Sequence, residues 1–196
     1  MPKIVDADER LATIHEAVFR LVERGGVPAA SLRNVANEAG LNVGSVRHYV
    51  GSHTELLRGA VGRLQERVTA RLLRHADGLR ADVAATRRGE IAIDMLEELV
   101  PLDAERRQEA ALWQAFLEHA RVHDDIGGLA TEMAGGIREF TGRLLAAAGV
   151  SATAVPAEAL ACVLDGLAVA TLHDPAAYDR RRVRAILRWQ LTRTLT

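Results

Sequence analysis

The chain has 196 residues, of which 48% are hydrophobic and 26% are charged. This composition is typical of a globular protein and excludes a disordered or collagen-like chain. The formal net charge of -1 excludes a globally basic protein. Residues 1–75 carry 11 Lys and Arg against 8 Asp and Glu, whereas residues 76–196 carry 14 against 18. The first part is therefore the better candidate for contact with a polyanion.

Cysteine content and hydropathy bear on the cellular compartment. Cys162 is the single cysteine, which excludes an intramolecular disulfide and a zinc site built from several cysteines. Residues 1–6 lack the apolar stretch of a signal peptide. The apolar run over residues 159–172 is interrupted by Asp165 and is too short to span a bilayer. We therefore expect a cytoplasmic protein without membrane contact.

Apolar periodicity and capping signals predict four helices in the first 75 residues. Apolar residues at helical spacing before Gly25 predict the first helix. Ser31 and Asn42 are N-cap residues for the next two helices, and Ser52 with Glu55 forms a capping box for the fourth. The predicted ranges are 8–24, 32–39, 43–50 and 53–75.

The second half also shows helical periodicity alone. Val100-Pro101 closes one helix, Asp103 caps the next, and Pro156 suits the first turn of a later one. No segment shows the alternation of a strand, so the predicted fold is all-α. One predicted helix contains residues 113–120. The other predicted helices cover residues 88–99, 126–144, 156–173 and 179–194.

The segment over residues 32–50 has the spacing of a helix-turn-helix. Ala36 is small where two short helices cross, Gly40 suits a left-handed turn, and Val46 is a buried residue of the second helix. This spacing holds the second helix at the surface, where it can enter a DNA groove. The alternative is a helix pair with a structural role alone.

Polar residues of this second helix are candidates for reading DNA. Arg47 can donate two hydrogen bonds to guanine, and Ser45 and His48 can donate to bases or phosphates. Tyr49 can hydrogen-bond a phosphate, and Arg33 starts the preceding helix, where it would face the DNA backbone. The alternative is that these residues form an ordinary solvated surface.

Residues 10–57 resemble the DNA-binding domain of the TetR family of transcriptional regulators. The family pattern has Tyr at the position of Arg47, Phe at Val50 and Lys at His53. Because the family Lys contacts phosphate, the resemblance implies a contact at His53 that depends on its protonation. The resemblance rests on Arg10, Ile14, Ala17, Gly25, Gly44-Ser45-Val46, Tyr49-Val50 and Ser52-x-x-Glu55-Leu56-Leu57. The predicted DNA-binding residues are Arg33, Asn42, Val43, Gly44, Ser45, Arg47, His48, Tyr49 and His53.

Residues 99–116 and 159–175 resemble the C-terminal domain of choline-responsive repressors of betaine synthesis within this family. Leu112-Trp113 and Asp165-Gly166-Leu167 carry that likeness. The resemblance implies an all-helical homodimer with two domains. These are a three-helix helix-turn-helix domain over residues 1–52 and a helical ligand-binding and dimerisation domain over residues 53–196.

Apolar residues on the last two helices predict a four-helix dimer interface about a two-fold axis. The alternative is that they form the ordinary core of one protomer. The predicted interface residues are Leu160, Val163, Leu164, Leu167, Val183, Ile186 and Leu187.

The resemblance also implies an unknown small-molecule effector, whose pocket would be lined by large apolar residues. At helical spacing such residues form core more often than a ligand site, and a cationic ligand would need an aromatic cage. The predicted pocket residues are Trp113, Phe116, Met133, Ile137 and Phe140.

Two further features have alternative interpretations. His119 and His123 precede Asp124-Asp125 at a spacing that can bind a divalent metal. The preferred interpretation is two surface histidines at a helix end. Cys162 lies on an apolar helix face and is expected to be a buried thiol. We predict no metal and no cofactor.

The sequence therefore predicts a ligand-responsive, DNA-binding transcriptional regulator. We expect a repressor that a small molecule releases from a palindromic operator of double-stranded DNA. An enzyme is not expected, because the chain has no P-loop, GxSxG or dinucleotide-binding glycine motif. The alternative is a helical protein-interaction module of the same fold without sequence-specific DNA binding.

Overall fold

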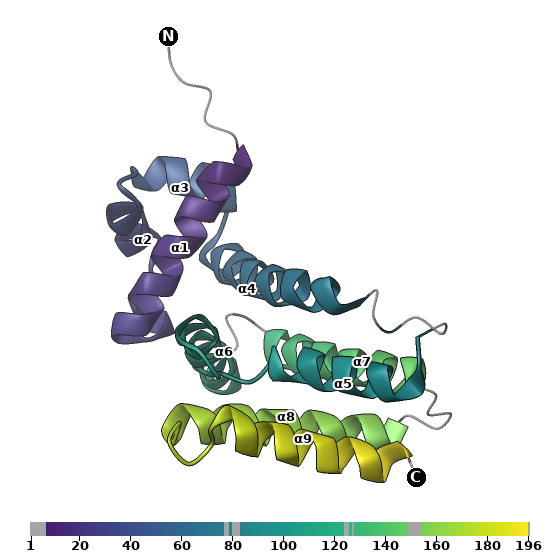
Figure 1. The fold of residues 1–196 in the computed structure, drawn as a ribbon. Helices are drawn as coiled ribbons and strands as arrows, with labels where there is room; N and C mark the ends of the chain where they lie inside the picture. The colour runs from purple at the N-terminus through teal and green to yellow at the C-terminus, as the bar shows by residue number, and fades with distance from the viewer. Residues whose placement is uncertain are drawn as a thin grey trace. The chain divides into compact units, whose positions relative to one another are not determined.

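The computed structural model describes residues 7–76, 79, 83–123, 126, 128–148 and 154–195. These residues form nine α-helices, with a short 3-10 helix after the first, and contain no strand (Figure 1). The all-α prediction is therefore confirmed. The elements are α1 (Ala7–Gly25), η1 (Val27–Ala29), α2 (Leu32–Ala39), α3 (Val43–Val50), α4 (His53–Ala76), α5 (Ala85–Glu97), α6 (Ala104–Val122), α7 (Leu129–Ala147), α8 (Ala154–His173) and α9 (Arg180–Leu195).

Capping side chains define where the short helices begin. The Ser31 hydroxyl accepts a hydrogen bond from the Asn34 amide at 3.2 Å, at the start of α2. The predicted capping box before α4 is present, because the Ser52 amide donates to Glu55 at 2.8 Å and the Glu55 amide donates to Ser52 at 3.1 Å. Helices α2 and α3 have the predicted bounds. Among the elements of the described residues, η1, which contains Pro28, is the one that lacks a counterpart in the prediction.

Residue contacts group the chain into two units. The first comprises Met1–Glu66 and Ala111–Ala130, and the second comprises Arg67–Ala110 and Thr131–Thr196. Helices α4 and α6 therefore contribute residues to both units. The predicted division after residue 52 stays a prediction.

The core of the first unit forms where α1 packs against α2 and α3. Its buried side chains come from the apolar stripe of α1 and from the inner faces of the other helices. The first half of α4 adds a stripe of its own. The buried residues are Ile14, Ala17, Val18, Phe19, Val22, Val35, Ala36, Val46, Val50, Leu56, Leu57, Ala60, Val61 and Leu64.

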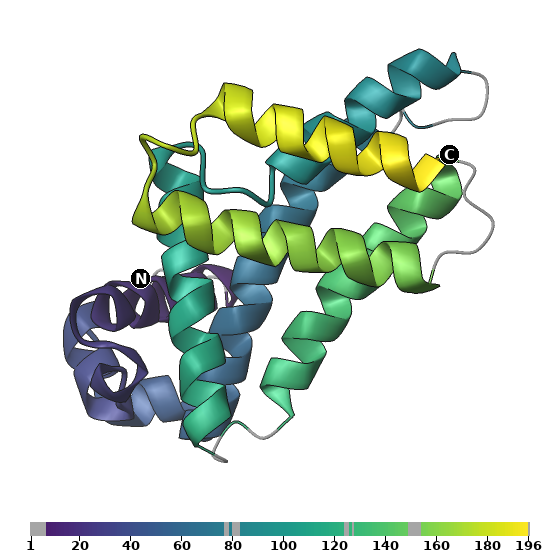
Figure 2. The same ribbon diagram turned by 90° about the horizontal axis from the view of Figure 1, so that it is seen from below.

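The core of the second unit is formed by α5, α8 and α9 with the end of α7. Helices α8 and α9 lie side by side, and α9 also packs against α5 (Figure 2). Its central buried residues include Leu96, Leu145, Leu160, Leu164, Val183 and Leu187.

Helix α8 is longer and more apolar than the sequence interpretation assumed. It spans 20 residues with a mean hydropathy of 1.6, which suffices in length and composition to cross a membrane, and 33% of that window is buried. The apolar run over residues 159–172 lies within this longer helix, which begins at Ala154, and the absence of membrane contact stays a prediction. In the second unit, Leu160, Leu164 and Leu167 of α8 belong to the hydrophobic core.

Candidate nucleic-acid interface

The turn between α2 and α3 has the geometry of a helix-turn-helix. Gly40 ends α2 in the left-handed conformation, with φ 67° and ψ 33°, which costs an L side chain energy but suits glycine. The Leu41 amide then donates to the Ala36 carbonyl at 2.8 Å, and the Asn42 side chain accepts from the Ser45 amide at 2.7 Å to begin α3. The predicted role of Gly40 in the turn is confirmed.

Ala36 and Val46 are fully buried on the two sides of this turn. Because a small residue and a β-branched residue fill the contact between α2 and α3, the polar side of α3 is left at the surface. Val43, Gly44, Arg47 and His48 of α3 are exposed there.

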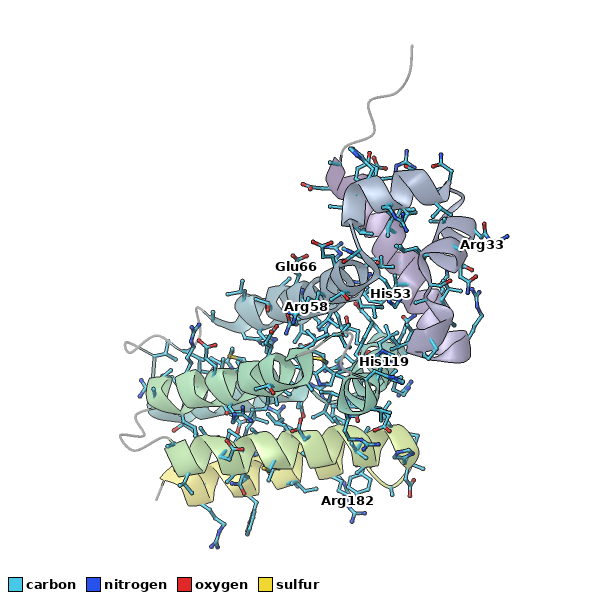
Figure 3. The ribbon with its side chains drawn as sticks, turned by 180° about the vertical axis from the view of Figure 1, so that it is seen from behind. Arg33, His53, Arg58, Glu66, His119 and Arg182 are labelled. Atoms are coloured by element: carbon cyan, nitrogen blue, oxygen red, sulfur yellow. The ribbon has the colours of Figure 1, made fainter. Side chains whose placement is uncertain are left out.

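The remaining residues predicted to touch DNA differ in how free they are. Ser45 and Tyr49 are half-buried, and the Tyr49 ring packs edge-on against His48 with centroids 5.4 Å apart. Asn42 already uses its side-chain oxygen to cap α3. Arg33 is exposed on α2 and points away from it (Figure 3).

His53 is held at the first turn of α4. Its Nε2 atom lies 3.2 Å from the carbonyl oxygen of Ala30, and the side chain is partly buried. A neutral ring that donates from Nε2 to Ala30 has only Nδ1 left for another partner. The implied phosphate contact at His53 stays a prediction.

An ion-pair cluster joins α1 to α2 and was missed by the sequence interpretation. Arg20 Nε donates to Glu38 at 2.7 Å, and Arg24 donates to the other carboxylate oxygen. The hydrogen bonds from these two guanidinium groups lower the pKa of Glu38. Arg20 and Arg24 are four residues apart, but nothing in the sequence shows that α2 places Glu38 between them.

The predicted pocket residues do not form one group within a single unit. Phe116 is fully buried and Trp113 is half-buried, and both lie in the first unit. Met133 is fully buried, and Ile137 and Phe140 pack on the core of the second unit. A surface cavity of about 550 Å³ lies near the start of α9, and none of the predicted pocket residues lines it. Its lining residues are Ala177, Asp179, Arg181, Arg182 and Ala185. Arg182 at this cavity projects outward (Figure 3). Its guanidinium carbon lies over the Tyr178 ring, 5.0 Å from the ring centroid.

The predicted dimer residues lie mostly inside the protomer. Val163 and Ile186 are partly buried against the core of the second unit, and the others are buried in it: Leu160, Leu164, Leu167, Val183 and Leu187. A side chain without exposed surface cannot bury more on association. These five are therefore core residues, as the alternative interpretation held, and a dimer through α8 and α9 stays a prediction.

Cys162 and the histidine pair His119 and His123 were the two further features that the sequence singled out. The expectation that Cys162 is buried is wrong: the thiol is exposed on α8. His119 and His123 stack with ring centroids 4.4 Å apart at the end of α6. Asp124 and Asp125 lie outside the described residues. Within the described part of the chain, no group of three or more potential metal ligands is present.

Ion pairs between distant helices of the second unit were also missed by the sequence interpretation. Arg71 of α4 pairs with Glu109 of α6, and both are buried. Arg184 of α9 donates to Asp94 at 2.7 Å and to the buried Glu97 at 3.0 Å, and these carboxylates raise its pKa. These pairs join residues that are far apart in the sequence, so no local pattern indicates them.

Comparison with known proteins agrees with this geometry. A family model described as the C-terminal domain of BetI-type transcriptional repressors matches residues 90–196. The HTH-type transcriptional regulator PksA of Bacillus subtilis (strain 168) is 32% identical over 191 residues, which cover 95% of this chain and 90% of PksA.

Solved structures have the same fold. The TetR-family member SCO1917 from Streptomyces coelicolor A3 matches with a TM-score of 0.72 and 28% identity, covering 93% of this chain and 98% of SCO1917. The multidrug binding protein EbrR, complexed with malachite green, matches with a TM-score of 0.70 and 27% identity over 93% of this chain and 98% of EbrR. The fold and the turn at Gly40 therefore define a helix-turn-helix transcriptional regulator. The chain belongs to the TetR family of transcriptional regulators, with a C-terminal domain of the BetI type.

Proposed function

We propose that this protein is a homodimeric repressor that binds a palindromic operator and is released from it by a small molecule. The observation that carries the proposal is the exposed polar face of α3, which follows a well-formed turn at Gly40. One such helix reads few bases, whereas two helices about 34 Å apart read both halves of a palindrome.

In this proposal, α3 enters the major groove with Arg47 and His48 toward the base edges. Arg47 is exposed on α3, and a guanidinium donates two hydrogen bonds to guanine O6 and N7. Arg33 and Tyr49 bind phosphates on either side, which fixes the position of the protein on the duplex.

A second copy of the chain packs against the exposed face of α8 and α9. Because the predicted apolar residues of these helices fill the protomer core, the contact falls to their outer residues. Trp189 is 60% exposed, Val155 is 79% exposed and Val169 is 38% exposed. Large apolar side chains left at a surface mark interaction sites when they cluster.

A small-molecule effector binds the helical C-terminal part. The complex of the similar protein EbrR with malachite green supports this part of the proposal. Helix α4 contributes to both units of the chain, so a change at its second half reaches the residues that follow α3. The coupling free energy that this release requires between effector binding and operator binding is about 1–3 kcal/mol.

Because its relatives include a bacterial regulator, we place the protein in the cytoplasm with the chromosome, and we assign it no catalytic activity.

Selection of duplexes from a random library tests the proposal. The purified full-length chain is used at about 0.15 M salt, which suppresses binding through phosphates alone. We expect a palindromic motif, and Arg47→Ala should lose or relax it at one base position in each half. A folded protein that enriches no motif would contradict the proposal and favour the protein-interaction module.

A further inference from the structure

The side chain of His15 on α1 lies against Gly59 of α4 in the first unit. A Cβ atom added to Gly59 of α4 would lie 2.7 Å from Nε2 and 3.2 Å from Cε1 of His15 on α1. Such distances are too short for a carbon atom that is not bonded to the ring. The His15 ring therefore occupies the space that any other residue at position 59 would need.

The face of α4 that receives the ring also carries charge. Gly59, Arg63 and Glu66 follow one another at helical spacing, and Arg63 Nη1 donates to Glu66 at 3.3 Å. Burial lowers the pKa of His15, Arg63 lowers it further, and Glu66 opposes this change. The ring is therefore neutral at pH 7 and packs on α4 as an uncharged wedge.

The beginning of α4 is closely connected to the DNA-reading helix. Only Gly51 and Ser52 separate the last residue of α3 from His53, the first residue of α4. The capping box of Ser52 and Glu55 and the contact of His53 with Ala30 stiffen this corner. A shift of α4 along or away from α1 is therefore transmitted to α3.

We propose that the seat of His15 on Gly59 is a positioning contact, which sets the spacing of α1 and α4 that operator binding requires. The inference rests on the proposed function, because its readout is operator affinity. His15 acts through α4 and α3 and does not itself touch DNA. Overpacking this contact moves the reading helix even though the unit stays folded.

The test adds a methyl group at position 59 and removes the ring at position 15, singly and together, in the full-length protein. The variants are Gly59→Ala, His15→Ala and the double variant, with Gly62→Ala as matched control. Gly62 lies one turn further along α4, and a Cβ added there meets nothing within 4 Å among the described residues. The probe is the palindromic duplex recovered by selection, and each dissociation constant is measured below the unfolding transition of every variant.

We expect Gly59→Ala to bind the duplex about tenfold more weakly, which corresponds to about 1.4 kcal/mol. Gly62→Ala should bind like the wild type. The double variant should recover most of the loss, because removing the ring makes room for the new methyl group. A contact with a structural role alone would lower the unfolding temperature and leave the dissociation constant unchanged.

Three outcomes would overturn the inference while leaving the proposed function intact. Gly59→Ala could bind like the wild type, which would mean that the ring moves aside at no cost. The double variant could be folded and still bind as weakly as Gly59→Ala, or Gly62→Ala could weaken binding equally. If the wild type itself binds no selected duplex, the proposed function fails and the inference falls with it.

Discussion

Arg71 of α4 and Glu109 of α6 form a buried ion pair joined by two hydrogen bonds, one of them 2.9 Å long. Arg71 also lies 3.3 Å from Glu98 at the end of α5. The pair therefore ties the second half of α4 to α6 within the second unit.

Breaking this pair should destabilise the protein strongly. Glu109→Ala leaves the Arg71 guanidinium buried without its principal partner, which costs about 3–5 kcal/mol. Glu118→Ala is the matched control, since Glu118 pairs with Arg121 at the surface, and it should change the unfolding free energy little. Urea denaturation measures both, and equal effects of the two substitutions would contradict a special role for the buried pair.

Arg47→Ala tests base reading by α3. We expect the substitution to cost about 1–3 kcal/mol of operator binding and to relax one base position in each half-site. Arg181→Ala, which removes an exposed arginine of α9, is the control and should leave binding unchanged. Titration of both variants with the selected duplex at one salt concentration measures the effect. Equal binding by Arg47→Ala and the wild type would show that position 47 does not face a base.

His53→Lys tests the implied phosphate contact at the start of α4. A lysine cannot reproduce the bond that His53 makes to the Ala30 carbonyl from a ring nitrogen, but its charge reaches a phosphate at every working pH. One added phosphate contact should steepen the logarithmic dependence of affinity on salt by about 0.9. An unchanged slope would place position 53 away from the DNA backbone.

The burial of His15 predicts a particular pH dependence of stability. The folded protein lowers the pKa of His15 below its ordinary value of 6.5, so in this range the folded state binds fewer protons than the unfolded chain. The stability that the neutral ring supplies is fully present above pH 6.5, and it is lost as the pH falls from that value through the lower pKa of the folded state. His15→Gln should remove this part of the acid sensitivity in thermal melts between pH 5 and pH 7.5. Identical pH profiles for the two proteins would mean that His15 titrates normally.

Trp189→Asp tests the dimer contact through α8 and α9. Placing a carboxylate where 60% of the Trp189 side chain is exposed should dissociate the dimer, because an interface core excludes unpaired charge. Leu73→Asp is the matched control, since Leu73 of α4 is an apolar residue with a similar exposed fraction of 66%, and it should leave the dimer intact. Sedimentation equilibrium distinguishes the two variants. A Trp189→Asp protein that remains a dimer would exclude this face.

The sequence was most informative where one short segment decides the structure. Ser31, Asn42 and the capping box of Ser52 and Glu55 satisfy amides within three residues of themselves, so the bounds of α2 and α3 could be predicted from local pattern alone. The exposed side of α3 followed from the same periodicity. The tie between Glu38 and the two arginines of α1 could not be predicted, because it depends on how two helices cross.

The last two helices show the limit of apolar pattern. Helix α8 has apolar residues around most of its circumference, with a mean hydropathy of 1.6 in its most apolar window. The periodicity therefore does not say which stripe faces the core and which faces outward. Leu160 and Leu164 turned out to be core, whereas Cys162 on the same helix is exposed.

We propose that the protein reads DNA as a symmetric dimer. Its most direct test is the affinity of the full-length chain for three duplexes at about 0.15 M salt: the selected palindrome, a duplex with one intact half, and a scrambled sequence. We expect two protomers on the palindrome, an affinity at least about 10³-fold above that for the scrambled duplex, and intermediate binding to the single half. Equal affinity for the palindrome and the scrambled duplex would contradict it.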